Sequence, residues 1–284
     1  MPPGLLDAVD CEVAYLGTEL QELVSMQQAQ VTRLLYAFEH AHMPILTAMF
    51  DLTKRAVVLT GATGNIGPAV VRAYLDQGAH VAMAVRDPAR GAALKAELGG
   101  DERLMEAVAD PADRQAMERF VEQVLRVWGR LDVLANLVGG YAASAAADGD
   151  LAAYRASWDQ KVATAVTATA ACIRPMRARG YGRIVSVASM SALKGEKGAA
   201  GYAMANAALV RWTESLAEET KREGITANVV MPRIIDTPEN RAAMPKSDPS
   251  RWATGAEIAA LVVFLSSEEA SGLTGTAIPV VARM

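Results

Sequence analysis

The chain has 284 residues, of which 51% are hydrophobic and 21% are charged, and its net charge is −4 at pH 7. This size suits one α/β domain with an N-terminal extension. The net negative charge and the lack of a basic run argue against a nucleic-acid partner. The two cysteines, Cys11 and Cys172, are too few for a disulfide scaffold or a zinc site.

Neither secretion nor membrane insertion is indicated by the sequence. The start Met1-Pro2-Pro3-Gly4 lacks the basic and long apolar signal of a secreted protein. Apolar stretches such as Val162–Ile173 are too short and too rich in threonine to span a bilayer. We therefore expect a cytoplasmic protein without a membrane span and without a bound metal.

The segment before the first strand contains one apolar helical seam. Its members recur at alternating steps of four and three residues, namely Leu20, Val24, Gln27, Val31, Leu34 and Phe38. Such a helix buries its stripe on its own domain, on a second copy or on another protein. We expect residues 1–52 to form a helical extension for self-association, as a dimer or tetramer, or for docking a protein partner. Packing on the same chain is the alternative.

From residue 56, a strand, a glycine-rich turn and a helix follow one another. Ala56–Leu59 is a short apolar run, Thr60–Gly67 is the turn, and Pro68 stands in the first helical turn. Glycines let the backbone approach a pyrophosphate, and the free N–H groups of the helix favour the anion. The segment predicts a phosphate cradle, with a simple tight turn as the alternative.

Strand-like and helix-like runs then alternate as far as the C-terminus. Further strands are expected at His80–Val85, Arg103–Val108, Leu131–Asn136, Arg183–Val187 and Ile225–Met231, and helices at Ala112–Val127, Ala152–Arg179 and Tyr202–Arg222. A break of the middle helix is expected near Pro175. Such alternation is typical of a doubly wound parallel sheet.

Several motifs occur along this pattern in a fixed order. They are Thr60–Gly67, Asn136–Gly139, Gly182–Ser189, Tyr202 at a set distance after Ser189, and Asn228–Thr237. Together they resemble the cofactor loop, the N-N-A-G element, the serine strand, the catalytic tyrosine and the nicotinamide segment of the short-chain dehydrogenases/reductases. The resemblance runs from Lys54 to the C-terminus. It implies a Rossmann-like α/β domain over residues 53–284 and hydride transfer to or from a small molecule.

The resemblance also implies which residues form the site. The cofactor-binding positions are Thr60, Gly61, Thr63, Gly64, Asn65, Ile66, Gly67, Arg86, Asp110, Asn136, Gly139, Tyr202, Asn206, Pro232, Ile235 and Thr237. The catalytic positions are Ser189, Tyr202 and Asn206. Strand-end, packing, turn and cap roles are the rival explanations for the serine, the tyrosine and the polar residues at strand ends.

Two of the family's four catalytic positions are altered in this chain. The family's lysine, four residues after the tyrosine, is replaced by Asn206. The asparagine that holds a relay water should precede Pro175, yet no asparagine occurs between Asn136 and Asn206. Asn65 and Arg233 are smaller departures, at a glycine of the loop and at the glycine after Pro232.

Loss of the lysine should affect the two directions of the reaction differently. An ordinary tyrosine has a pKa of about 10, and a cation about 4 Å away can lower it by units. Asn206 is neutral, so it can hydrogen-bond ribose hydroxyls but stabilises a phenolate poorly. Oxidation needs Tyr202 as a base and should suffer most, whereas reduction needs it only as a proton donor.

Another lysine can replace the missing cation. The candidates are Lys161, in the helix where the relay asparagine is expected, and Lys194 and Lys197, between Ser189 and Tyr202. Lys161 would amount to an exchange of the lysine and asparagine positions. The alternative is that it is solvated, as charged residues on helices usually are.

Cofactor choice is expected to depend on the end of the second strand. Arg86 stands where a basic residue attracts the 2′-phosphate of NADP, while Asp87 can pair with it or bind a ribose hydroxyl. We therefore expect NADP(H), with NAD as the second choice. The substrate walls should come from residues 140–150, 190–201 and 234–250, whose few polar side chains suggest an apolar or roomy site.

Two functions remain open on sequence alone. One is an NADP(H)-dependent reductase of a carbonyl or related small molecule, in which Ser189 polarises the oxygen and Tyr202 donates the proton. The other is a catalytically degenerate, nucleotide-binding structural or regulatory subunit. Chemistry at Tyr202 distinguishes them.

Overall fold

Seven short apolar runs form one parallel sheet in the computed structural model, which describes residues 50–282. The strands are β1 (Ala56–Thr60), β2 (His80–Val85), β3 (Leu104–Val108), β4 (Val133–Asn136), β5 (Gly182–Val187), β6 (Ile225–Pro232) and β7 (Ala277–Val280). Their order in the sheet is β3-β2-β1-β4-β5-β6-β7. Every residue of β1, β5 and β6 is buried, as expected for strands that are covered on both faces.

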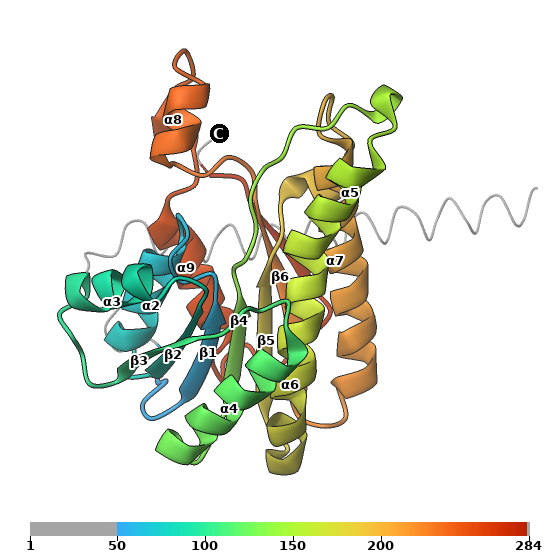
Figure 1. Cartoon of the computed structure of the whole chain (residues 1–284). Helices are drawn as coiled ribbons and strands as arrows, with labels where there is room; N and C mark the ends of the chain where they lie inside the picture. The colour runs from blue at the N-terminus through green and yellow to red at the C-terminus, as the bar shows by residue number, and fades with distance from the viewer. Residues whose placement is uncertain (1–49, 283–284) are drawn as a thin grey trace, which may run out of the picture. The chain divides into compact units, whose positions relative to one another are not determined.

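Helices connect the strands and cover both faces of the sheet. The helices are α2 (Gly67–Asp76), α3 (Pro88–Glu97), α4 (Arg114–Trp128), α5 (Leu151–Trp158), α6 (Thr164–Arg179), α7 (Ala200–Thr220), α8 (Pro238–Ala243) and α9 (Gly255–Leu265). Figure 1 shows α4, α6 and α7 on one face, while α2 and α9 pack together on the other. This arrangement confirms the predicted doubly wound fold.

The strand order reverses beside β1, which determines where a ligand can bind. The chain leaves β1 toward β2 and β3, then returns to β4 on the opposite side of β1. At such a switch point, open α/β proteins bind their ligands in a crevice at the carboxyl ends of the strands. The predicted glycine-rich loop and Asn136 both lie at this edge.

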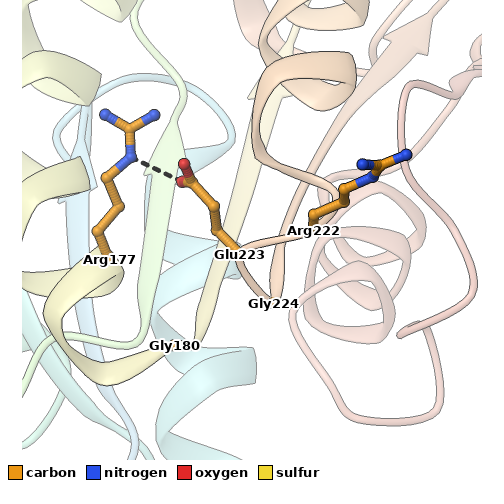
Figure 2. A pocket seen from close by; sticks show the side chains of 5 residues that line it. All are labelled: Arg177, Gly180, Arg222, Glu223 and Gly224. Atoms are coloured by element: carbon orange, nitrogen blue, oxygen red, sulfur yellow. Dashed lines mark hydrogen bonds and ion pairs between the residues drawn. The ribbon is translucent and has the colours of Figure 1, made fainter.

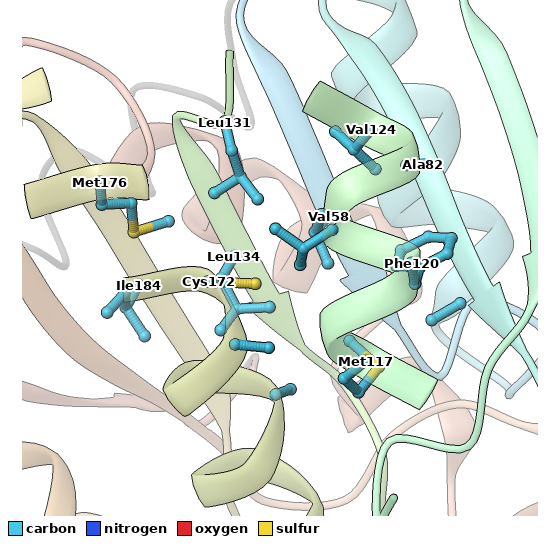
Figure 3. Close-up of a cluster of buried hydrophobic side chains, with 14 of the residues drawn as sticks. Val58, Ala82, Met117, Phe120, Val124, Leu131, Leu134, Cys172, Met176 and Ile184 are labelled. Atoms are coloured by element: carbon cyan, nitrogen blue, oxygen red, sulfur yellow. The ribbon is translucent and has the colours of Figure 1, made fainter. Parts of the chain in front are cut away.

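One large apolar cluster holds α4 and α6 against the sheet. Figure 3 shows Phe120 and Met117 of α4 facing Val58 and Leu134 of the central strands. Cys172 of α6 lies in the same cluster, and burial raises the pKa of its thiol. The free cysteine is therefore a packing residue of the core.

The long helix before β5 differs from its prediction in one respect. Pro175 lies inside α6, which continues to Arg179 without the expected break. The irregularity lies earlier, where the π-helical turn η3 (Asp159–Ala163) joins α5 to α6. A π turn inserts one extra residue into the helical repeat and so changes which side chains face the sheet.

The predicted N-terminal extension, residues 1–52, lies almost entirely outside the described residues. Its apolar seam and its role in self-association or docking stay predictions. Phe50 and Leu52 are described and are buried in the domain, where Leu52 donates its backbone N–H to Gln77. Within residues 50–282, no helix combines the length and apolar character needed to cross a bilayer.

Candidate active site

The turn after β1 brings backbone close to backbone, and glycine is required at two of its positions. Gly61 has a φ of +79°, and a Cβ there would lie 2.8 Å from the backbone nitrogen of Val138. A Cβ on Gly67 would lie 1.9 Å from the carbonyl oxygen of Ala62. These contacts bring the loop against the segment that follows β4 and set the start of α2 tightly against the turn.

The N-terminus of helix α2 has no side-chain cap, although the N–H of Gly67 donates to the carbonyl oxygen of Gly64. Its N-cap is Ile66, whose side chain makes no capping hydrogen bond, and Pro68 occupies the first turn. No acidic residue stands in that first turn. Because free N–H groups and the helix dipole both favour negative charge, this terminus fits the predicted phosphate position.

Three central strands are linked by polar side chains just below the crevice. Thr60 donates its hydroxyl to the amide oxygen of Asn136 at 3.4 Å, and the amide nitrogen of Asn136 donates to Ser186 at 3.4 Å. All three side chains are buried. Asn136 thus ties β1 to β5, which shows a structural role for this predicted cofactor-binding residue.

The end of β2 presents positive charge to the glycine-rich loop. Arg86 is exposed, and the guanidinium of Arg90 donates to the carbonyl oxygen of Thr63 at 2.7 Å. The carboxylate of Asp87 is engaged as the N-cap of α3, where it accepts from the backbone of Ala89 and Arg90. Arg90 was not among the predicted residues, because α3 was not predicted. The Asp87-Pro88 cap is the signal that could have revealed it.

Two predicted cofactor contacts at the rim also stabilise local structure. Asp110 accepts a hydrogen bond from the backbone of Ala112, which is the turn role that rivals adenine binding. Thr237 caps α8 by accepting from the backbone of Asn240, and Asn240 donates its side-chain amide to Ile235. Asn65 of the glycine-rich loop donates to Glu239 of α8 at 3.1 Å, so the loop and α8 meet.

Ser189 and Tyr202 lie together at the end of β5. Ser189 is buried and caps a short turn by accepting from the backbone of Ser191. Burial raises the pKa of Tyr202, and the Ser189 side chain acts in the opposite direction. The Tyr202 ring meets Tyr141 edge-on, with 5.4 Å between ring centroids. Tyr202 is therefore a neutral phenol at physiological pH, which is the form that donates a proton.

Asn206 lies one helical turn after Tyr202 and is fully buried. Its amide nitrogen donates to the carbonyl oxygen of Tyr202 at 2.8 Å, within the same helix. Its amide oxygen is buried and has no hydrogen-bond partner among the described residues. The side chain is thus an acceptor rather than a cation, and it can take a hydrogen bond from a hydroxyl group.

Lys161 is buried, whereas Lys194 and Lys197 are exposed. The ammonium of Lys161 donates to the carbonyl oxygens of Val138, after β4, and of Val187, at the end of β5. The structure thus excludes the solvated alternative for Lys161. The other two lysines lie in the exposed loop that was predicted.

Some polar side chains in the predicted substrate walls already have partners within the protein. Ser144 is buried and accepts from the backbone of Gly201, while Arg241 pairs with Asp236 at 2.6 Å. Tyr141 remains exposed beside Tyr202. Tyr141 therefore contacts the predicted catalytic Tyr202, and the charge of Glu196, also from the predicted walls, helps to raise the pKa of Tyr202.

A second hollow lies at the opposite edge of the sheet. Figure 2 shows it lined by Arg177, Gly180, Arg222, Glu223 and Gly224, with Arg177 and Glu223 paired at 2.6 Å. It stands at the amino ends of β5 and β6, far along these strands from Ser189. It contains none of the predicted site residues.

A nicotinamide dinucleotide fits the groups at the carboxyl edge. The cradle is formed by Gly61 and Gly67, whose Cβ positions are filled by backbone, and by the uncapped start of α2. The unpartnered amide oxygen of Asn206 is a further acceptor for such a ligand. Fold and site together define a dinucleotide-binding α/β protein with a serine–tyrosine pair.

Comparisons with known proteins give the family. The pattern of the family described as short chain dehydrogenase matches residues 55–248. The chain is 31% identical to Nodulation protein G of Rhizobium sp. (strain N33) over 246 residues, which is 82% of this chain and 97% of that protein. It is 31% identical to the 3-oxoacyl-acyl-carrier-protein reductase FabG of Escherichia coli (strain K12) over 235 residues, which cover 78% and 93% of the two chains.

A solved structure supports the same assignment. The crystal structure of levodione reductase matches with a TM-score of 0.74 and 26% identity, over 81% of this chain and 96% of that chain. The chain therefore belongs to the short-chain dehydrogenase family and is an NAD(P)-dependent dehydrogenase or reductase.

Proposed function

We propose that this protein is an NADP(H)-dependent reductase that converts the carbonyl group of a small molecule to an alcohol. The observation that carries the proposal is the neutral Tyr202 beside the buried Ser189, at the edge of a glycine cradle. A phenol whose pKa is raised donates a proton readily only to a strongly developing alkoxide, which is what reduction creates. FabG and levodione reductase are both named as reductases, which supports this direction.

Each residue of the site has a proposed role in this reaction. When bound, the nicotinamide supplies a hydride. Ser189 orients the carbonyl oxygen of the substrate by hydrogen bonding, and Tyr202 gives that oxygen its proton. Asn206 accepts a hydrogen bond from a ribose hydroxyl through its free amide oxygen.

The preference for NADP(H) over NAD(H) follows from the charges at the end of β2. Asp87 is committed to capping α3, so its carboxylate is poorly placed to bind a ribose 2′-hydroxyl. Arg86 is exposed there, and Arg90 reaches back to the glycine-rich loop. Two guanidinium groups without a free carboxylate between them favour a 2′-phosphate.

Titration of the purified chain with NADPH and NADH tests the cofactor, and reduction of a panel of ketones and aldehydes tests the chemistry. We expect NADPH to bind more tightly, and Arg86→Ala to weaken NADPH more than NADH. Tyr202→Phe should abolish reduction while leaving NADPH binding intact. If NADPH binds but the native chain reduces no substrate, the chain is instead a nucleotide-binding subunit without turnover. If the native chain reduces a substrate and Tyr202→Phe keeps that rate, Tyr202 is not the proton donor.

A further inference from the structure

Lys161 is a buried cation without an acidic partner. Its ammonium donates to the carbonyl oxygens of Val138 at 3.1 Å and Val187 at 3.0 Å. These two carbonyls belong to the strand ends that lead into Gly139 and Ser189. Within residues 50–282, no carboxylate pairs with it. Burying an unpaired charge costs free energy. A buried ammonium at this edge of the sheet is therefore a candidate for a functional role.

The backbone around Lys161 is shaped to admit its ammonium group. A Cβ on Gly139 would lie 2.0 Å from the side-chain nitrogen of Lys161, so a larger residue there would force the end of the lysine side chain to move. Lys161 is carried by the π turn, and the Thr164 hydroxyl that follows this turn donates to the carbonyl oxygen of Gln160 at 2.7 Å. Such turns are frequent at functional sites because they redirect a side chain.

Two hydrogen-bonding groups remain open, one on the π turn and one on α7. An ammonium has three N–H donors, and the described residues accept two from Lys161. The buried amide oxygen of Asn206 has no donor. The π turn packs against α7, the helix that carries both Tyr202 and Asn206. A donor and an acceptor are thus left unused on two elements that pack together.

We propose that Lys161 supplies the positive charge of the active site, in place of the lysine that is absent from position 206. This inference rests on the proposed carbonyl reduction and identifies the group that assists Tyr202. The site then retains a serine, a tyrosine, a lysine and an asparagine, but the last two have exchanged helices.

Burial, rather than any charged or titratable neighbour, determines the pKa shift of Lys161. The elements packed against the π turn carry Tyr154 and Arg155 on α5 and Tyr202 on α7, whose charged residues begin farther along at Arg211, while Asp159 of the turn itself is exposed. The arginines of α6 lie in its second half, from Arg174 onward. Burial alone lowers the pKa of Lys161, to about 8. The ammonium is therefore charged at neutral pH and loses its proton in a mildly alkaline solution.

The reaction balances with this charge in place. The substrate carbon gains the hydride as the π electrons of its C=O bond form a new O–H bond with the proton of Tyr202. The electron pair of the broken phenolic O–H bond stays on Tyr202, where the ammonium of Lys161 stabilises the phenolate. An N–H proton of Lys161 then restores the phenol through solvent, and water reprotonates the amine.

The exchange predicts a distinct pH dependence. Reduction uses the state in which Lys161 is an ammonium, so its rate should fall as the pH rises through about 8. Oxidation of the alcohol uses the state with one proton fewer, so its rate should rise through the same pKa. The neutral side chain of Asn206 does not titrate, so by itself it would produce neither of these two changes of rate with pH.

The test uses the full chain and three variants. Lys161→Met removes the charge, and Lys161→Asn combined with Asn206→Lys restores the arrangement usual in the family. Lys221→Met is the matched control, since it removes an exposed lysine that pairs with Glu218 at the far end of α7. Steady-state rates of reduction and oxidation are measured against pH, with NADPH affinity measured by fluorescence titration.

We expect Lys161→Met to lower the rate of reduction about a hundredfold and to remove the limb near pH 8. The double variant should recover reduction with its limb moved to another pH, and Lys221→Met should match the native chain. Nitrogen NMR of the lysine side chains, independent of turnover, should show a signal missing from Lys161→Met that titrates near the same pH and moves when NADP binds.

The outcomes separate the two proposals. If the native chain neither binds NADPH nor reduces a carbonyl, the proposed function fails and the role of Lys161 fails with it. If the native chain is active but Lys161→Met, folded and binding NADPH normally, keeps its rate and its pH profile, only the role of Lys161 is overturned. The same holds if the lysine signal does not respond to bound NADP.

Discussion

Burial of the Lys161 ammonium, which hydrogen-bonds only to neutral carbonyls, lowers the unfolding free energy of the protein. Desolvation lowers the pKa of Lys161 to about 8 from the ordinary 10.5. The unfolded chain therefore binds more protons than the folded chain between these two values. The cost is fully present below about pH 8 and is relieved as the pH rises toward 10.5, and it amounts to about 3 kcal/mol.

We predict that this cost appears as a pH-dependent stability difference. Relative to Lys161→Met, the native chain should gain about 2 kcal/mol of unfolding free energy between about pH 8 and about pH 10. Urea denaturation of both proteins across this range measures the difference. Lys221→Met, with its exposed ion pair, should show no such trend. A constant difference between the native chain and Lys161→Met would mean that Lys161 keeps an ordinary pKa.

At the residue level, the sequence identifies the candidate catalytic residues but does not distinguish among the three candidate lysines. The spacing of Ser189, Tyr202 and Asn206 was visible in the sequence, as was the absence of a relay asparagine. Which of the three lysines is buried at the strand ends depended on tertiary packing and on the π turn, and neither has a short-range sequence signal. Hydrophobic periodicity predicts a regular helix through Lys161 and so misses its redirection.

At the scale of elements, α8 and the glycine-rich loop are joined by one exposed contact. Asn65 donates to the carboxylate of Glu239 at 3.1 Å. This places a negative charge beside the loop and the α2 terminus that fit a pyrophosphate. Because like charges repel, the carboxylate should oppose dinucleotide binding to a modest degree.

We predict that Glu239→Gln tightens NADPH binding. An exposed charge of this kind is worth about 1 kcal/mol at most, so the affinity should rise about two- to fivefold at low salt, and less at high salt. Fluorescence titration at two ionic strengths measures the effect. Glu219→Gln removes an exposed charge near the far end of α7 and should leave the affinity unchanged. Weaker NADPH binding by Glu239→Gln would show that the contact with Asn65 helps to form the site.

Strands with apolar runs are predictable from the sequence, whereas a helix whose start depends on a polar N-cap is not. The strand His80–Val85 was predicted at its observed bounds, because β-branched apolar runs between turns are distinctive. Helix α3 was missed because its alanine-rich sequence gives a weak apolar stripe. It starts from the Asp87 cap and Pro88 instead. Pro175 does not break α6, because the packing of this helix against the sheet outweighs the local penalty.

Across the whole domain, the two edges of the sheet carry different kinds of polar structure. The carboxyl edge has groups with open hydrogen-bonding capacity, such as the amide oxygen of Asn206. The amino edge has a network of ion pairs around Asp132, whose buried carboxylate accepts from Arg55, from Arg130 and from the backbone of Ala56, while the nearby Tyr181 hydroxyl has no partner among the described residues. Tyr181 lies between the guanidinium groups of Arg55 and Arg183, at 4.2 and 4.3 Å from its ring centroid.

This division means that stability and chemistry can be changed separately. Asp132 is fully buried just before β4 and pairs with Arg130 at 2.6 Å and with Arg55 at 3.4 Å, while Arg55 also pairs with Glu268 at 2.6 Å. Removing one partner of such a network leaves the remaining charges poorly paired in a low-dielectric setting. Lys161 and Tyr202 lie at the other end of the strands, so their protonation should not respond.

We therefore predict that Asp132→Asn lowers the unfolding free energy by about 3 kcal/mol, whereas Glu118→Gln, which breaks the exposed pair with Arg114, costs less than about 0.5 kcal/mol. Urea denaturation at neutral pH measures both values. At temperatures where Asp132→Asn remains folded, its rate of carbonyl reduction should keep the native limb near pH 8. A shift of that limb in Asp132→Asn would show that the amino-edge network sets the charge state of the active site.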